Sequence, residues 1–288
     1  MKRKVFKSKT FNNEFYKSGY IVFDHNQTSI SERLSQLYTK YSHENVNKGF
    51  NTTHFSHNSN YKREVLQLAK DIFKESFSEQ LIEYEVFFAN LMIKTPNNKD
   101  LLPVHADWVY VDEDKYSAIS IWIPADDITD QNGPFGIIPN SCQLYEPIRG
   151  PEIVSSFRKF DKVLKDEKGV LLPITRKQAV LYDLRLLHYS LPNRTSTPRI
   201  AINITLKHRN SEIIHYSKQG NKIHKFNHLN EEFFHNYHAH QIPKDKVPSE
   251  VIPITPQISD KEIIEHFQLS VSSKSPSLWE KITHIFKL

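Results

Sequence analysis

The stretch Arg199-Ile200-Ala201-Ile202-Asn203-Ile204-Thr205-Leu206-Lys207 alternates apolar side chains with small or polar ones. Successive side chains of a β-strand point to opposite faces of the sheet, so this pattern predicts a strand with two different faces. The apolar face suits a hydrophobic core. The other face, which carries Arg199 and Asn203, suits a cavity that holds a polar ligand.

Shorter segments of the same kind precede this strand. Tyr84 to Lys94 is rich in β-forming residues, and Ser117 to Pro124 alternates around three isoleucines. Turn residues such as Asn132-Gly133-Pro134 separate the segments. Further strands are expected after Gly19, at 135–139, 169–174 and 178–183, and around His188. Many short strands joined by Pro, Gly and Asn turns favour a sandwich or jelly roll.

Helical patterns flank the strand-rich part. Ser29-Ile30-Ser31-Glu32 has the sequence of a capping box, and an apolar stripe runs from Val65 to Phe73. Residues 43–60 are rich in His and Asn, which favours a flexible loop with exposed histidines. Ser277-Leu278-Trp279-Glu280 predicts a C-terminal amphipathic helix. The 288 residues are therefore expected to form one domain, with a helical part at 11–80, a core at about 84–210 and a polar extension at 211–288.

Composition narrows the function classes. Apolar residues make up 38% of the chain and aromatic residues 12%, which is enough for a sizeable core. The net charge is +5, but the lysines are scattered, so a basic surface is favoured over a nucleic-acid site. A single cysteine, Cys142, suits a reducing compartment. No apolar run follows the basic N-terminus or approaches the roughly 20 residues of a membrane span, so we expect a cytoplasmic protein.

His105-Ala106-Asp107 is the first sign of chemistry. Residues two apart on a strand share a face, so one imidazole and one carboxylate would lie side by side. A later histidine, for which His188 is suited, would complete the two-His, one-carboxylate set of non-haem Fe(II) sites. Arg199 suits a carboxylate-bearing co-substrate, and Ser190 would point the same way as His188. The alternative is a hydrogen-bonded His/Asp pair, a core histidine and a surface arginine.

Together these motifs resemble the phytanoyl-CoA dioxygenase family. The resemblance covers roughly residues 84 to 210 and rests on motifs that occur in the family's order: His105-Ala106-Asp107-Trp108, Ser120-Ile121-Trp122-Ile123-Pro124, Asn132-Gly133-Pro134, Ile138-Pro139-Asn140-Ser141, Leu187-His188-Tyr189-Ser190, Pro192-Asn193-Arg194 and Pro198-Arg199. The chain departs from the family in one loop, where the common Pro-Gly-Ser-His is replaced by Pro139-Asn140-Ser141-Cys142. Asn tolerates the left-handed turn that Gly would adopt, so the loop should keep its conformation.

The resemblance implies a mainly β fold with flanking α-helices, built on a double-stranded β-helix (a jelly-roll, cupin-like core). It implies an oxygenase that uses Fe(II), 2-oxoglutarate and O2, and that releases succinate and CO2. It implies no catalytic residue beyond the metal centre. The residues that it implies are His105, Asp107 and His188 as iron ligands, Arg199 and Ser190 on the distal carboxylate of 2-oxoglutarate, and Asn90 and Trp122 beside the co-substrate.

The carboxylate at position 107 predicts hydroxylation, or a desaturating or ring-forming variant, because related halogenases need a small residue there. The substrate is open. A cavity lined by Phe87, Trp108 and Tyr110 would suit a small amino-acid-like or natural-product molecule, although a Trp on a barrel strand is as typical of a core. The alternatives are a non-catalytic, cupin-like metabolite-binding protein and an oxygenase that acts on an acyl, lipid or nucleic-acid substrate. The oligomeric state is also open.

Overall fold

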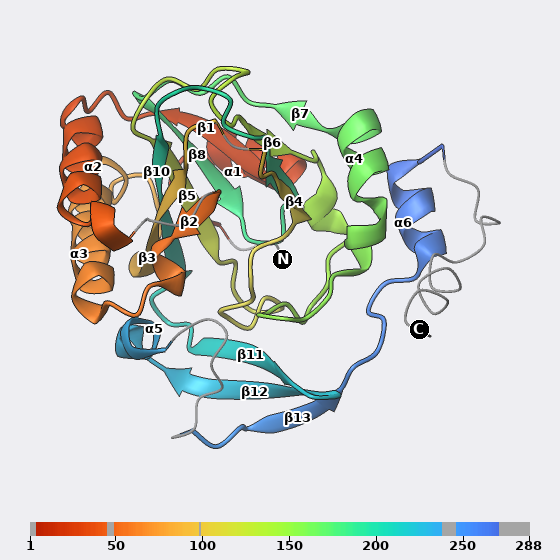
Figure 1. Ribbon diagram of the computed structural model, residues 1–288. Helices are drawn as coiled ribbons and strands as arrows, with labels where there is room; N and C mark the ends of the chain where they lie inside the picture. Colours follow the sequence, from red (N-terminus) through yellow and green to blue (C-terminus); the bar gives the residue numbers. More distant parts are fainter. Residues whose placement is uncertain (1–3, 45–48, 98, 238–245, 271–288) are drawn as a thin grey trace, which may run out of the picture.

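Two antiparallel sheets form the body of the computed structural model, which describes residues 4–44, 49–97, 99–237 and 246–270 (Figure 1). The larger sheet has the strand order β1-β8-β5-β10-β3-β2, and the smaller has the order β4-β9-β6-β7. Their strands are β1 Tyr20–Asp24, β2 Phe50–Thr52, β3 Tyr84–Lys94, β4 Leu102–His105, β5 Ile119–Pro124, β6 Phe135–Ile137, β7 Val170–Leu171, β8 Gln178–Asp183, β9 His188–Ser190 and β10 Arg199–His208. This is the jelly-roll core that the turn-rich strand pattern predicts.

Strand β10 lies inside the larger sheet and has the two faces expected from its sequence. Ile200, Ile202, Ile204 and Leu206 are buried in a cluster with apolar residues of the N-terminal helices. On the opposite face, Ala201 belongs to a second cluster that joins residues of both sheets. The polar face of β10 therefore looks into the space between the sheets.

Helices cover the outer sides of the two sheets. α1 (Lys9–Ser18), α2 (Ser29–Lys40) and α3 (Ser59–Ser76) contribute to the cluster on the outer face of the larger sheet. On the side of the smaller sheet, α4 (Asp161–Lys168) and α6 (Asp260–Phe267) share a third cluster with residues of β4 and β9 (Figure 1). Short 3-10 helices also lie in the connections, among them η1 Ser42–Glu44, η3 Ser141–Gln143 and η4 Ser156–Phe160.

Two local predictions in the N-terminal part were wrong. The helix expected at Ser29 is present, but its N-cap is Thr28, which makes no side-chain capping hydrogen bond. The segment 43–60 is more ordered than a flexible loop, because β2 pairs with the end of β3 and the 3-10 helix η2 (Thr53–Phe55) follows it. As a result His54 is buried, with 5% exposure, whereas His57 is exposed as expected.

The polar segment after His208 folds into a third sheet, which the sequence pattern did not indicate. β11 (Ile213–Gln219), β12 (Lys222–Leu229) and β13 (Glu250–Pro253) pair in that order, and α5 (Glu231–Asn236) packs against α3. This sheet lies below the two-sheet body in Figure 1. The C-terminal helix expected from Ser277 falls outside the described residues. Within the described residues, no helix has the length and apolar character required to traverse a bilayer.

Asn140 has the left-handed conformation expected for it, with φ of 62°. We predict that Asn140→Val lowers the free energy of unfolding by about 1–2 kcal/mol, because a β-branched residue is strained in this region. Asn140→Gly should leave stability unchanged or slightly higher. Urea denaturation of both variants tests this prediction, and equal stability of the Val and Gly variants would contradict it.

Candidate metal centre

His105, Asp107 and His188 converge where the two short strands β4 and β9 pair. His105 is the last residue of β4 and lies opposite His188, the first residue of β9, with ring centroids 4.2 Å apart. Asp107 Oδ1 is 3.6 Å from His188 Nε2. One ligand atom from each residue lies within 4.8 Å of the others, so the three could hold a metal ion. Asp107 stands two residues beyond the end of β4, not on the strand as expected.

Backbone carbonyls orient both imidazoles. His105 Nδ1 lies 2.8 Å from the carbonyl oxygen of Pro103, and His188 Nδ1 lies 3.0 Å from that of Leu186. With the proton on Nδ1, each ring donates to its carbonyl and leaves Nε2 as a free base for a metal. Burial, together with the neighbouring His188, lowers the pKa of His105 to about 4. His105 is therefore neutral at physiological pH, as a metal ligand must be.

Two hydroxyl groups orient the carboxylate of Asp107. Tyr182 on β8 donates to its Oδ2 at 2.9 Å, and Ser120 on β5 donates to the same oxygen at 3.3 Å. Burial, and next the charge of Asp107, raise the pKa of Tyr182 well above its usual value, so the hydroxyl stays a donor. Oδ1 remains directed toward His188. The sequence prediction missed Tyr182, although a tyrosine in the apolar strand ahead of His188 was a usable signal.

A buried ion pair holds the main chain that carries Asp107. Arg149 Nε donates to the carbonyl oxygen of Asp107 at 2.6 Å, and its two terminal nitrogens bind both oxygens of Glu113 at 3.0 and 2.7 Å. Both side chains are only 6% exposed. The amide of Val109 also donates to the Arg149 carbonyl at 3.2 Å. Arg149 lies in the long polar connection, where the sequence offered no reason to select it.

The side chain of Arg199 is buried, and two of its nitrogens have no acceptor among the described residues. Arg199 is 4% exposed, and its Nε and Nη1 have no hydrogen-bond partner in the part of the chain that the structure describes. Its Cζ lies 5.5 Å from the ring centroid of Trp122. Burial lowers the pKa of Arg199 to about 10, so it is still charged at neutral pH. Since an unpaired buried charge is costly, this position is suited to an anionic ligand.

Stacked aromatic rings connect Arg199 with the triad. Trp122 stacks on Phe135 with centroids 5.0 Å apart, and Phe135 stacks on His188 at 5.4 Å. Ser190 is buried on β9, two residues beyond His188, as expected. Asn90 on β3 lies opposite Asn203 of β10, and its side-chain oxygen accepts from Thr53 at 3.3 Å. The carboxylate-binding candidates and the triad thus belong to the same inter-sheet space.

The three expected substrate residues have different surroundings. Phe87 and Tyr110 are buried in an aromatic cluster with Phe234, their centroids 5.4 to 5.8 Å apart. Trp108 is half-buried and has edge-on contacts with His54 and His215. Trp108 therefore has more access to solvent than the other two residues.

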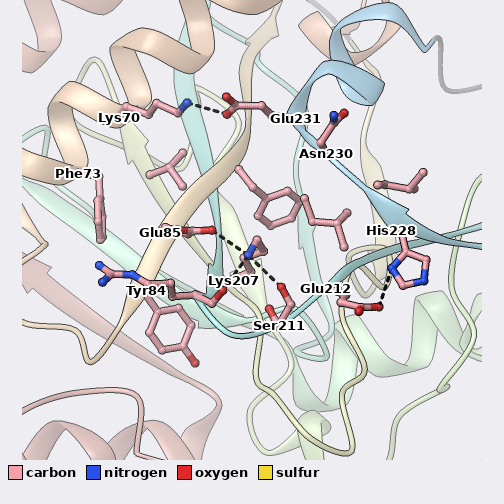
Figure 2. A pocket seen from close by; sticks show the side chains of 15 residues that line it. Lys70, Phe73, Tyr84, Glu85, Lys207, Ser211, Glu212, His228, Asn230 and Glu231 are labelled. Atoms are coloured by element: carbon pink, nitrogen blue, oxygen red, sulfur yellow. Dashed lines mark hydrogen bonds and ion pairs between the residues drawn. The ribbon is translucent and has the colours of Figure 1, made fainter.

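A groove of about 690 Å³ lies outside the two-sheet space and is lined by no member of the triad. Figure 2 shows three ion pairs among its polar side chains. Lys70 pairs with Glu231 at 2.6 Å, Lys207 with Glu85 at 2.8 Å, and His228 with Glu212 at 3.3 Å. These pairs leave the groove without an excess of either charge, unlike the surroundings of Arg199.

Lys94, opposite Arg199 in the β3–β10 register, generates a pH prediction. Burial, and next the charge of Arg199, lower the pKa of Lys94 from 10.5 to about 7. Between these pH values the unfolded chain binds more protons than the folded one, so the free energy of unfolding rises with pH. Below pH 7 Lys94 is protonated in the folded and the unfolded chain, so the folded protein carries the full free-energy cost of burying the ammonium.

We therefore predict that Lys94→Met reduces the rise in unfolding free energy between pH 7 and 10, as measured by urea denaturation. Exposed Lys74→Met is the control and should keep the wild-type slope. The same slope in the Lys94 variant would contradict the prediction.

Comparison with known proteins agrees with this geometry. Residues 24–201 match the family model of phytanoyl-CoA dioxygenase (PhyH). No curated protein matches the chain in sequence. A similar solved structure is EvdO2 from Micromonospora carbonacea var. aurantiaca, with 20% identity and a TM-score of 0.50 over 72% of this chain and 94% of that chain. EvdO2 has also been solved with 2-oxoglutarate.

A second similar structure is SnoK, a non-haem, α-ketoglutarate-dependent carbocyclase from nogalamycin biosynthesis. It shares 14% identity and has a TM-score of 0.52 over 86% of this chain and 96% of that chain. Both structures share the fold of this chain. The family match extends over more than half of the sequence and includes β4, β5, β9 and the start of β10. The chain therefore belongs to the phytanoyl-CoA dioxygenase family, with Fe(II) and 2-oxoglutarate as its cofactor and co-substrate.

Proposed function

We propose that this protein is a dioxygenase that hydroxylates a small amino-acid-like or natural-product substrate and releases succinate and CO2. His105, Asp107 and His188 hold Fe(II), and Arg199 with Ser190 holds the distal carboxylate of 2-oxoglutarate. Asn90 and Trp122 flank the co-substrate. The observation that carries the proposal is that the three metal-ligating groups share one interior with a buried guanidinium, two nitrogens of which have no acceptor among the described residues.

The residues present fit the iron and the co-substrate. Two imidazoles and one carboxylate are the ligand set of non-haem Fe(II) oxygenases, which leaves coordination positions open. A guanidinium binds a carboxylate through parallel hydrogen bonds, for which Arg199 has unused donors. When bound, Fe(II) and 2-oxoglutarate supply the oxidation, by activating O2 as 2-oxoglutarate is decarboxylated.

The chain's own groups position these partners and keep water out. The carbonyls of Pro103 and Leu186 fix the imidazole orientation, and Tyr182 fixes that of Asp107. The stacked rings of Trp122 and Phe135 fill the space between Arg199 and His188. Because Asp107 supplies a carboxylate where a halogenase needs a small residue, the site favours transfer of oxygen over transfer of halide.

The iron assignment predicts a spectroscopic signal. Anaerobic addition of Fe(II) and 2-oxoglutarate should produce a weak charge-transfer absorbance in the visible range, and His105→Ala should abolish it. Arg199→Met should weaken 2-oxoglutarate binding by about 10- to 100-fold, because a charge-assisted hydrogen bond is lost. Arg209→Met, in the outer groove, serves as the control and should bind normally.

Absorbance that persists in His105→Ala would overturn the ligand assignment. Metal analysis of the purified protein separates the proposal from the non-catalytic, cupin-like alternative. That alternative is supported if the protein neither retains iron nor consumes 2-oxoglutarate.

The Arg149 ion pair predicts a positioning effect on metal affinity. The double variant Arg149→Met/Glu113→Gln removes the contact with the Asp107 carbonyl without leaving a buried carboxylate unpaired. It should weaken Fe(II) binding by about 10- to 100-fold, as is typical when a partner of a metal ligand is lost. The matched control, Lys207→Met/Glu85→Gln, removes an ion pair in the outer groove and should bind Fe(II) normally. Equal Fe(II) affinities in competition titrations would contradict the prediction.

A further inference from the structure

The segment that carries His105, Asp107 and Trp108 is the partly exposed part of the metal centre. Residues 105–108 are all partly exposed, and the Asp107 side chain retains 21% exposure. The strands β5, β6 and β9, by contrast, are buried throughout. Because Trp108 directly follows Asp107, a molecule that approaches the metal centre along this segment passes its indole ring.

Two buried imidazoles flank that indole ring. The centroid of Trp108 lies 4.8 Å from that of His54 and 6.0 Å from that of His215, at interplanar angles of 70° and 61°. His54 is 5% exposed and His215 1% exposed. His215 also contacts Phe233 and Tyr237, at centroid distances of 5.6 and 5.4 Å. Trp108 and His215 thus form an aromatic wall with polar ring atoms inside it.

His215 has hydrogen-bonding capacity that its described neighbours do not use. Neither ring nitrogen has a hydrogen-bond partner among residues 4–44, 49–97, 99–237 and 246–270. Burial lowers the pKa of His215 to about 3, so the ring is neutral and offers one donor and one acceptor. Buried polar groups normally have hydrogen-bond partners, so the two unused nitrogens of His215 indicate a position that a ligand can occupy.

Backbone contacts fix where His215 lies. The amide of Ile214 donates to the carbonyl oxygen of Tyr110 at 2.9 Å, which ties β11 to the segment that follows Asp107. The pairing of β11 with β12 shifts register between Ile213 and His215. Such bulges re-aim a side chain and occur often next to active sites. His215 lies outside residues 24–201, which match the family model.

Two cations among the described residues of this region, Arg149 and Lys62, are already engaged. Arg149 binds Glu113 and the Asp107 carbonyl, and Lys62 donates to the carbonyls of Phe234 and Tyr237. A neutral imidazole and an indole cannot offset the charge of a carboxylate or a phosphate. They suit a hydroxyl or an amide that lies next to an apolar surface.

We propose that Trp108 and His215 form a substrate-binding wall for an uncharged organic molecule, in which His215 hydrogen-bonds a hydroxyl or amide group and Trp108 packs on the adjoining apolar face. This inference rests on the proposed function, because it names the substrate of the same metal centre. It disfavours acyl-CoA thioesters and free amino acids, which would bring uncompensated charge to the wall.

The test measures anaerobic calorimetric binding to the Fe(II)/2-oxoglutarate-loaded protein. The uncharged probes are a set of methyl glycosides and N-acetyl amino-acid amides, and the charged probes are octanoyl-CoA and free phenylalanine. An uncharged probe should bind best in this anaerobic measurement, and it should stimulate succinate release once O2 is admitted. His215→Phe, which keeps the ring volume, should weaken its binding by about tenfold or more. His215→Gln, which keeps a donor and an acceptor, should bind within a few-fold of the wild type.

His224→Phe, on the neighbouring strand β12, is the matched control and should bind the probe normally. The inference is overturned if no uncharged probe binds, if a charged probe binds more tightly, or if His215→Phe binds as well as the wild type. The charge-transfer absorbance of the wild type distinguishes a failure of the proposed function from a failure of the substrate wall. If it is absent, the proposed function itself has failed, whereas its presence with any of these results rejects the substrate wall alone. The ranking of probes on the wild type does not depend on how the variants fold.

Discussion

A carboxylate that stands two residues beyond the end of its strand has to be held by something other than the strand. Asp107 is in that position, because β4 ends at His105. Its side chain is fixed by hydroxyls of two strands from the opposite sheet, and its main chain is fixed by Arg149. The metal centre therefore exists only when both sheets and the long connection are in place. Metal binding therefore requires that the two sheets and the connection fold together.

The two faces of β10 have different environments, one in the hydrophobic core and the other beside the candidate ligand site. Its isoleucines pack outward against the helices, where apolar burial stabilises the fold. Arg199 and Asn203 project from the other face into the space between the sheets. Because neighbouring residues point to opposite faces, the apolar and polar environments are separated by the thickness of one sheet.

In the described part of the chain, two cations lie close together in the interior, and neither forms an ion pair with a buried carboxylate. Lys94 donates to the carbonyl oxygens of Asp100, Ser190 and Leu191, whereas two nitrogens of Arg199 have no described acceptor. Both residues have a lowered pKa because they are buried. Such an arrangement costs stability in the free protein and is relieved when an anion binds. Local rules of stability are commonly broken in this way at functional sites.

The sequence by itself determined the long strands of the two-sheet body and the three candidate metal ligands, but not β2 or the third sheet. Alternation is a local property, so β3, β5 and β10 could be read directly, and His105, Asp107 and His188 stood in a recognisable order. The tertiary structure alone decided what surrounds those ligands. Tyr182, Arg149 and His215 are distant from Asp107 in the chain and lie in segments whose local pattern suggests only a strand or a polar connection. Their roles arise from pairing between strands and from burial, which depend on the whole fold and leave no periodic signal in the sequence.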